Sequence, residues 1–381
     1  MKIGIEASRS VSGGALKHLN GILRYSYFKS KKIKKVYLWG PSSTLKKLPN
    51  FIWLEKISTD FLGKFLLKKL FWQLFILPKI CKKLSINLLF NTTASSVCYF
   101  RPSVTLLQDI LPFENSIIQK FKFYHAFIYR ILILRLVFIK SLKNSCHIIF
   151  LSKYSKEVTS NFIKIKNHSI IPHGVDKFFY KINYKKITKK NNPINALYVS
   201  NALMYKNQWN VIAAIAEIRK RYQINIKLKI VGGGSGLSLK KMNRSKLKYD
   251  KNNKFVKLFG FSNKNQLKKY YQNSHIFIFA SSCESFGITL LEAMSVGIPI
   301  TCSNKSSMPE IIKNNTIYFN PENTEEIIVA IIKILTNDQL RNKLAIGAKV
   351  RSKHYTWKKS AKLTWKILNK VCKLHFIKKK N

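Results

Sequence analysis

Short apolar runs alternate with longer stretches of helical periodicity along the first half of the chain. A helical pattern follows Gly13-Gly14 and extends from about Ala15 to Phe28. Strands that alternate with helices in this way indicate a parallel sheet with helices on both faces. The apolar runs, each predicted to be a strand, are KIGIEA at 2–7, KVYLW at 35–39, INLLF at 86–90, SVTLL at 103–107 and HIIFL at 147–151.

The pattern breaks at residues 177–193, a Lys- and Asn-rich segment that ends in Pro193 and is typical of a linker. The alternation then restarts, with one predicted helix over about 208–221 and a last one over about 357–376. The predicted strands of this second half lie at 196–200, 226–231, 254–260, 275–280, 297–302 and 316–320.

This pattern predicts an α/β protein with two Rossmann-like parallel-sheet domains that face each other across a cleft. A length of 381 residues suits two domains, and 46% hydrophobic residues are enough to build their cores. The expected boundaries are 1–180 for the first domain, 194–354 for the second, and 355–381 for a C-terminal helix that packs back towards the first. A ligand is expected in the cleft, at the carboxyl ends of the strands.

The chain is strongly basic. It has 69 Lys and Arg against 16 Asp and Glu, a formal net charge of +53, and the excess is spread over both halves. Since 59 of the basic residues are Lys and only 10 are Arg, the residue suited to bidentate base recognition is scarce. We interpret the charge as a compositional bias and expect no specific nucleic acid partner. Attraction to anionic membrane surfaces follows from the charge in any case.

The six cysteines are scattered, with no C-x-x-C pair, as expected of buried thiols in a reducing compartment. The start of the chain lacks the long apolar stretch of a secretory signal. No run reaches the roughly 18 to 20 apolar residues that cross a bilayer. We therefore expect a cytoplasmic protein, peripheral on the inner face of the cytoplasmic membrane.

Two segments mix aromatic and aliphatic residues with Lys and Arg. One is 61–83, FLGKFLLKKLFWQLFILPKICKK, and the other is 121–143, FKFYHAFIYRILILRLVFIKSLK. Such a composition suits a helix at a lipid headgroup interface, and equally a core helix whose few charges reach the surface. For 121–143 both interpretations stay open, whereas for 61–83 the core helix is favoured.

The segment most informative about chemistry is 275–299, HIFIFASSCESFGITLLEAMSVGIP, which reads as a strand, a tight loop and a helix. A helix that starts near Phe286 or Gly287 leaves the first backbone N–H groups without intrahelical partners, which makes an anion site. Glu284 precedes this helix and Glu292 lies in its second turn. They either contact a ligand or, in the alternative, complement the helix dipole and a solvated face.

The pattern S-x-x-E-S-F-G-x-x-x-L-E-A-M-x-x-G-x-P in this segment resembles the E-x7-E signature of family-four retaining glycosyltransferases with the GT-B architecture. The chain is most similar to those that build bacterial surface polysaccharides. Other stretches that agree in order are Gly13-Gly14, IPHGVD at 171–176, YVSNALMYKNQ at 198–208, VGGG at 231–234, VKLFGF at 256–261 and SNKSSMPEII at 303–312.

The resemblance implies a role for each matching residue. Lys206 would neutralise the donor diphosphate, and the N–H groups of Phe286, Gly287, Ile288 and Thr289 would hold the distal phosphate. Glu292 would accept hydrogen bonds from the ribose, and Glu284 from the transferred sugar. The glycines expected near the donor are Gly14, Gly232 and Gly234.

The resemblance also implies retention of anomeric configuration without a protein nucleophile. No cofactor is implied, and no metal, because the chain has no Asp-x-Asp triplet. The expected partners are a GDP- or UDP-sugar and a lipid-linked or glycan acceptor in surface polysaccharide or lipopolysaccharide synthesis. A sugar-nucleotide 2-epimerase and a non-enzymatic basic protein that binds membrane or nucleic acid remain as alternatives.

Two positions depart from the family. The segment before Lys206 has no Arg, although relatives often carry one there. The first domain has Gln108-Asp109 where relatives often have His-Asp. Asp109, and beside it Glu114, remain candidates on the acceptor side.

Overall fold

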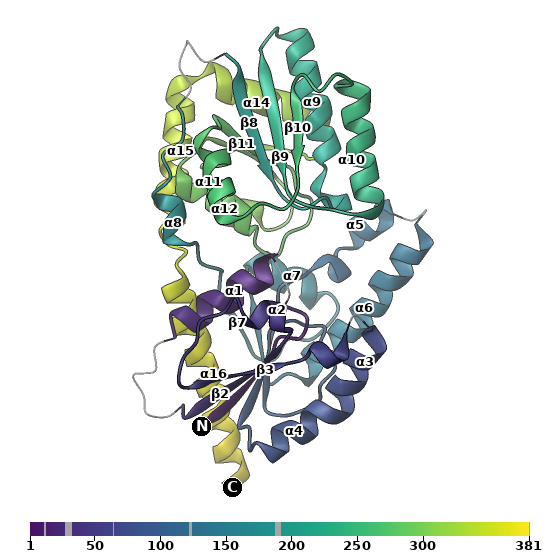
Figure 1. Ribbon diagram of the computed structural model, residues 1–381, viewed down its shortest axis with the longest axis vertical. Coiled ribbons are helices and arrows are strands. Elements are labelled where there is room, and N and C mark those ends of the chain that lie inside the picture. Colours follow the sequence, from purple (N-terminus) through teal and green to yellow (C-terminus); the bar gives the residue numbers. More distant parts are fainter. Residues whose placement is uncertain (11–12, 27–32, 64, 122–123, 187–191, 381) are drawn as a thin grey trace. The chain divides into compact units, whose positions relative to one another are not determined.

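The computed structural model describes residues 1–10, 13–26, 33–63, 65–121, 124–186 and 192–380. The chain divides into two compact units, one made of Met1–Gly174 with Thr356–Asn381 and the other of Val175–Tyr355. Each unit is built on one parallel sheet, of seven strands in the first and six in the second (Figure 1). The prediction of an α/β protein with two Rossmann-like units is confirmed.

The first sheet has the strand order β3-β2-β1-β4-β5-β6-β7, with every neighbouring pair parallel. The order changes direction between β1 and β4, a topological switch point of the kind at which such sheets bind ligands. Its central strands are buried because helices cover both faces. The strands are β1 (Lys2–Glu6), β2 (Lys35–Gly40), β3 (Leu54–Ser58), β4 (Leu88–Asn91), β5 (Ser103–Leu107), β6 (His147–Phe150) and β7 (His168–Ile170).

The helices of the first unit include a long one at the C-terminal end of the chain. They are α1 (Gly13–Arg24), α2 (Ser42–Leu45), η1 (Asp60–Leu62), α3 (Leu66–Phe71), η2 (Trp72–Ile76), α4 (Leu77–Lys83), η3 (Leu111–Phe113), α5 (Asn115–Lys120), α6 (His125–Asn144), α7 (Lys153–Ser160) and α16 (Trp357–Lys380).

The second sheet, β10-β9-β8-β11-β12-β13, repeats this order, and its switch point lies between β8 and β11. The strands are β8 (Ile194–Val199), β9 (Ile226–Val231), β10 (Val256–Phe259), β11 (Ile276–Phe279), β12 (Ile300–Ser303) and β13 (Ile317–Phe319). The helices are α8 (Lys177–Tyr180), η4 (Met204–Lys206), α9 (Gln208–Arg221), α10 (Gly236–Tyr249), α11 (Lys264–Gln272), α12 (Ile288–Val296), α13 (Met308–Ile312), α14 (Thr324–Thr336) and α15 (Asp338–Ser352).

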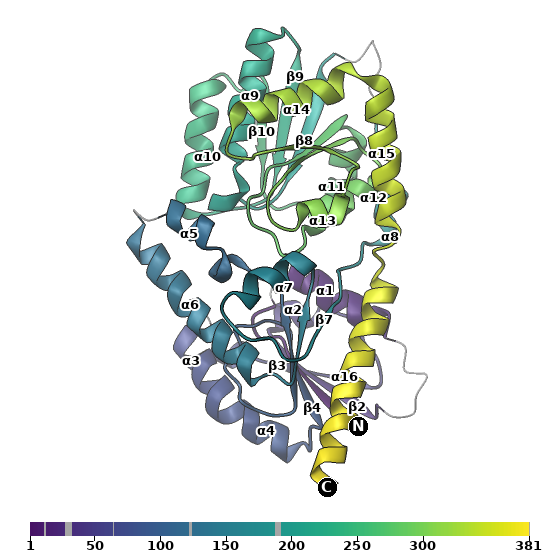
Figure 2. The same cartoon turned by 180° about the vertical axis from the view of Figure 1, so that it is seen from behind.

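The last helix, α16, packs against α1 and β4 of the first unit and runs along it in yellow in Figure 2. The Trp365 indole Nε1 donates a hydrogen bond of 2.9 Å to the Ile22 carbonyl. At the start of the helix, the Trp357 ring lies against two buried histidines, His18 and His173, whose Nδ1 atoms are 3.1 Å apart. Burial lowers the pKa of His18 to about 3 and that of His173 well below its usual value, so both imidazoles are neutral at physiological pH.

Two strands were not predicted from the sequence, and one helix lies where a linker was predicted. β3 (LEKIS) and β7 (HSI) are edge strands with half-exposed, partly polar residues, so they lack the apolar run that marked the others. α8 occupies the first residues of the segment predicted as a linker, and residues 187–191 of that segment lie outside the described residues.

The segment 61–83 differs from the core helix favoured for it. Its second half is anchored by buried Trp72, Leu77 and Cys81, but α3 contains no buried residue. Large apolar side chains between residues 61 and 75 are more than half exposed: Phe61, Phe65, Leu66, Leu67, Phe71 and Phe75. Lys68 and Lys69 lie on the same short helix. We call the residues Phe65, Leu66, Leu67, Phe71 and Phe75 the α3 face.

The segment 121–143 forms most of α6, which has both a core side and an exposed side. Ile131, Phe138 and Leu142 are buried, whereas Tyr129, Ile133 and Leu136 are each more than 60% exposed. α3, α4 and α6 lie along the same side of the first unit in both views (Figures 1 and 2). Within the described residues, no helix is both long and apolar enough to cross a membrane.

Candidate functional site

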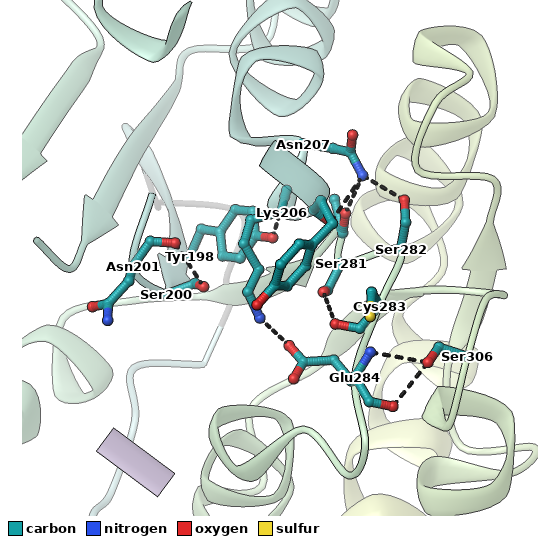
Figure 3. Close-up of polar contacts among 12 residues, drawn as sticks. Tyr198, Ser200, Asn201, Lys206, Asn207, Ser281, Ser282, Cys283, Glu284 and Ser306 are labelled. Carbon is teal, nitrogen blue, oxygen red and sulfur yellow. Dashed lines mark hydrogen bonds and ion pairs between the residues drawn. The ribbon is translucent and has the colours of Figure 1, made fainter. Parts of the chain in front are cut away.

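Two loops meet at the switch point of the second sheet (Figure 3). One leaves β8 and runs through η4 into α9, and the other leaves β11 and runs into α12. The Ser282 N–H donates to the Tyr205 carbonyl at 2.7 Å. Asn207, whose φ of 51° is left-handed, donates from Nδ2 to the Ala280 carbonyl at 3.0 Å and to Ser282 Oγ at 2.7 Å. These bonds fix the two loops to each other.

The junction brings Lys206 and Glu284 together. The Lys206 ammonium donates to Glu284 Oε1 and forms an ion pair with it (Figure 3). The two side chains are only 9% and 17% exposed. The residues are 78 positions apart in the sequence, and each lies in a loop that follows a central strand. The two charges predicted to contact the donor therefore lie at one point.

The ion pair has an aromatic and apolar surrounding. The Lys206 ammonium lies 4.9 Å from the centre of the Tyr205 ring and 5.8 Å from that of Phe279. Burial, with the negative charge of Glu284 as a second cause, raises the pKa of both Tyr198 and Cys302. In such a setting an ionic interaction is stronger than at an exposed surface, and an unpaired charge is more costly.

The serine hydroxyl of Ser306, in the loop after β12, holds the backbone of Glu284. The Glu284 N–H donates to Ser306 Oγ at 2.9 Å, and Ser306 Oγ donates back to the Glu284 carbonyl at 2.8 Å (Figure 3). One hydroxyl can make both bonds because it is at once a donor and an acceptor. Ser306 is thus a positioning residue for Glu284.

Gly232 and Gly234 lie against the loop that leads to Lys206. A Cβ at Gly232 would come within 2.2 Å of the Ser200 carbonyl oxygen, and one at Gly234 within 2.5 Å of the Ala202 Cβ. Gly232 also has a φ of +146°, a backbone conformation that residues with a side chain rarely adopt. Close packing of the loop after β9 against the loop after β8 therefore requires glycine at both positions, independently of any ligand.

α12 starts directly after Gly287, whose φ of +79° lies in the left-handed region that favours glycine. The Phe286 side chain is buried against Tyr355, so this residue can offer a ligand only its backbone. Ile288 and Thr289 are partly exposed at the start of the helix. The first N–H groups of an α-helix have no partner within the helix itself.

Glu292 is 3% exposed, on a helix whose residues Leu290–Val296 are all buried. The alternative that it lies on a solvated face is therefore wrong. Burial, followed by the charge of Glu292, raises the pKa of Tyr271. A carboxylate is seldom kept in the interior without a function or a network of partners.

The remaining predicted residues belong to the first unit. Gly14 is partly exposed at the start of α1, and nothing lies within 4 Å of the position of a Cβ there. Asp109 is exposed and accepts a hydrogen bond of 3.0 Å from the Leu111 N–H. Glu114 is buried and accepts a hydrogen bond of 2.8 Å from the Tyr154 hydroxyl, and burial raises the pKa of Glu114. Asp109 is thus engaged in its own turn and still open to solvent.

Comparison with known families assigns the second unit. The family described as "Glycosyl transferases group 1" matches residues 180–351, the segment that contains the Lys206–Glu284 pair, the start of α12 and Glu292. Residues 180–351 form a glycosyl transferases group 1 domain. This supports the family resemblance of the sequence, while the E-x7-E signature itself stays a prediction.

Among curated proteins, the chain is 27% identical over 227 residues to alpha-monoglucosyldiacylglycerol synthase of Acholeplasma laidlawii, covering 55% of this chain and 55% of that one. It is 28% identical over 103 residues to O-antigen chain mannosyltransferase B of Escherichia coli, covering 27% of each. The chain therefore matches about half or less of the length of these relatives.

Solved structures resemble the fold over nearly the whole chain. Sucrose-phosphate synthase from Thermosynechococcus elongatus aligns with a TM-score of 0.74 and 14% identity, covering 97% of this chain and 99% of that one. Anabaena HepE in complex with UDP-glucose aligns with a TM-score of 0.72 and 16% identity, covering 97% and 100%. These similarities show the GT-B fold, with two parallel-sheet units of which the second contains the group 1 domain.

Sequence reasoning missed the residues that position the site in the group 1 domain. Asn207 and Ser306, both with left-handed φ, carry the hydrogen bonds that hold the two loops and Glu284. Asn207 follows Lys206 directly, and an Asn between a strand and a helix is a recognisable signal for such a turn. Ser306 had no comparable signal. In the described part of the chain, no three His, Cys, Asp or Glu side chains gather where they could hold a metal ion.

Proposed function

We propose that this protein is a glycosyltransferase that moves a hexosyl group from a nucleoside diphosphate sugar to a glycan or lipid-linked acceptor in cell-surface polysaccharide or lipopolysaccharide synthesis. The observation that carries the proposal is the meeting of Lys206, Glu284 and the start of α12 at the switch point of the group 1 domain. A cation, a carboxylate and a helix N-terminus supply what a diphosphate joined to a sugar requires.

In this proposal the donor lies along the switch point. Lys206 neutralises the diphosphate, and the N–H groups of residues 286–289 hold the distal phosphate, where negative charge develops as the bond to the sugar breaks. Glu292 accepts hydrogen bonds from the ribose, and Glu284 from the sugar. Gly232 and Gly234 keep the loop before Lys206 close to β9, and thereby shape the nucleotide pocket.

The acceptor side belongs to the first unit, with Gly14 near the donor phosphates and Asp109 near the acceptor. We propose transfer with retention of configuration. The cation and the helix amides hold the departing phosphate on the face of the sugar that the acceptor approaches. The phosphate can then accept the proton of the acceptor hydroxyl on that face. Neither a protein nucleophile nor a metal ion has a place in this scheme, since Lys206 and the amides supply the positive charge.

The donor is tested by titration calorimetry, at moderate salt, with UDP, GDP and ADP and with glucose and mannose conjugates of these. We expect the protein to prefer one base. Replacement Glu292→Ala is expected to weaken binding of the preferred sugar nucleotide by on the order of 10- to 100-fold, because it removes charge-assisted hydrogen bonds.

The matched control for this test is Glu325→Ala, which removes the same charge from an exposed ion pair with Arg221 on the second unit. It should leave the affinity unchanged, and thermal melts should show that both variants are folded. An unchanged affinity in Glu292→Ala would contradict the role of that residue. Equal, weak and salt-sensitive binding of all nucleotides would contradict the enzyme itself, because only the +53 charge would then be acting.

We further propose that the protein works in the cytoplasm as a peripheral protein on the inner face of the cytoplasmic membrane, where a lipid-linked acceptor is found. Support comes from the α3 face, whose aromatic and leucine side chains stand exposed beside Lys68 and Lys69. Apolar side chains that enter the lipid and cations that meet anionic headgroups act together in interfacial helices.

The membrane proposal predicts that Leu67→Ser combined with Phe71→Ser reduces binding to anionic phosphatidylglycerol vesicles about tenfold or more, because two apolar side chains no longer enter the lipid. Co-sedimentation with vesicles measures this. Ile346→Ser with Val350→Ser makes the same kind of change at exposed positions of α15 and should have no effect. Equal loss in both double variants would show that the α3 face is not the docking surface.

A further inference from the structure

The positive and negative groups assigned to the donor are engaged with each other in this structure. The Lys206 ammonium pairs with Glu284 Oε1, and the two side chains are largely buried. Within the described residues, Glu284 makes no ion pair other than this one. A diphosphate cannot take the Lys206 ammonium without ending this contact or sharing it with a carboxylate that repels it.

The loop that carries Lys206 has no second cation to share this task. Residues 198–208, YVSNALMYKNQ, contain no Arg and no second Lys. Glu284 therefore depends on Lys206 for its charge balance, in a surrounding of aromatic rings. A carboxylate that loses its counter-ion in such a place must find hydrogen-bond donors elsewhere.

From these contacts we infer that donor binding is a partner exchange, in which Lys206 passes from Glu284 to the diphosphate while hydroxyl groups of the sugar replace it on Glu284. The inference rests on the proposed function and adds a source of selectivity to it. A complete sugar nucleotide satisfies both groups. A nucleoside diphosphate alone takes Lys206 and leaves Glu284 unpaired beside a second negative group, so the product is bound less well than the substrate.

The surrounding structure allows this exchange through side-chain rotation alone. Ser306 holds the backbone of Glu284 through both its N–H and its carbonyl. The Lys206 N–H donates to the Leu203 carbonyl at 2.9 Å, and its own carbonyl accepts from the Tyr198 hydroxyl. Since both backbones are fixed at their positions, the two side-chain ends can change partners without movement of the loops.

The test uses Glu284→Gln, which keeps the shape of the side chain and removes its charge. Calorimetry would compare the nucleoside diphosphate and the sugar nucleotide preferred by the unchanged protein, taken from UDP with UDP-glucose and GDP with GDP-mannose. The unchanged protein is expected to bind the sugar nucleotide about tenfold more tightly than the diphosphate. In Glu284→Gln, binding of the diphosphate should become on the order of tenfold tighter, and the preference should disappear.

Glu322→Gln is the matched control. Glu322, between β13 and α14, accepts a hydrogen bond at Oε1 from Ser282 Oγ in the loop of Glu284, so the variant removes the same charge close to the Lys206–Glu284 pair. It should leave the ratio of the two affinities unchanged, which separates partner exchange from a general change in net charge. Thermal melts of the three proteins confirm that each is folded.

A diphosphate affinity that stays the same or falls in Glu284→Gln would overturn the inference, even if the sugar nucleotide still binds and the proposed function holds. An equal gain in Glu322→Gln would also overturn it, because charge alone would then explain the effect. If no nucleotide bound selectively to the unchanged protein, both the inference and the proposed function would fall.

Discussion

Replacement of Lys206 by Met is expected to lower the rate of sugar transfer by about two to three orders of magnitude. Lys206 is the one basic residue of the loop that follows β8, and its ammonium lies at the switch point of the second sheet. Charge accumulates on the diphosphate as its bond to the sugar breaks, so a cation held there stabilises the transition state more than the ground state. The helix amides of α12 would remain and would limit the loss.

The rate is measured as release of nucleoside diphosphate from the donor that calorimetry identifies, in the presence of acceptor-containing membranes from the producing organism. Lys206→Met also removes the counter-ion of the buried Glu284, so part of the loss could reflect instability. The double variant Lys206→Met with Glu284→Gln also removes the unpaired negative charge of Glu284. It should recover thermal stability and still lack activity.

Lys241→Met serves as the control for charge. Lys241 lies over the Trp209 ring at 4.0 Å in the same unit, and its loss should leave the rate within about twofold, because isolated surface cations contribute little. A Lys206→Met protein that is folded and retains most of its rate would refute the assignment of Lys206 to the diphosphate. Recovery of activity in the double variant would refute it as well, since stability would then account for the effect.

Much of the fold could be read from the sequence because its strands are buried and its helices amphipathic. The apolar runs at 103–107 and 226–231 coincide with β5 and β9, and the pattern at 208–221 coincides with α9. These elements carry their signal in local periodicity, which the sequence displays directly. β3 and β7 carry little such signal, because each is an edge strand whose exposed residues are polar.

The site was predictable by residue type and less so by contact. Glu284 and Lys206 could each be placed in a loop after a central strand, but their pairing over 78 positions depends on the strand order. The burial of Glu292 could not be read from the sequence either, because an isolated Glu on a helix is most often solvated. The α3 face is the opposite case, apolar residues that are exposed where a core helix was favoured. Composition alone does not show which apolar residues lack a packing partner.

The C-terminal helix offers a prediction about folding that is independent of catalysis. Gly174→Ala is expected to destabilise the protein by at least about 3 kcal/mol, or to prevent folding, because the new Cβ would lie 2.0 Å from the Trp357 backbone nitrogen. That nitrogen cannot retreat easily, since the Trp357 ring packs against His18 and His173. Unfolding by urea measures the loss, with Gly260→Ala as the control, where nothing lies within 4 Å of a Cβ.

A second glycine makes the cause of this loss testable. A Cβ at Gly21 would come within 2.2 Å of the ring of Trp357, whereas the Cβ at Gly174 meets the backbone of the same residue. In a protein that already carries Trp357→Ala, Gly21→Ala should therefore cost little stability. Gly174→Ala should cost as much in that protein as it does in the unchanged one. A small cost in both cases would mean that the ring, and not the backbone at the start of α16, sets the spacing. A Gly174→Ala protein as stable as the Gly260→Ala control would contradict the close contact itself.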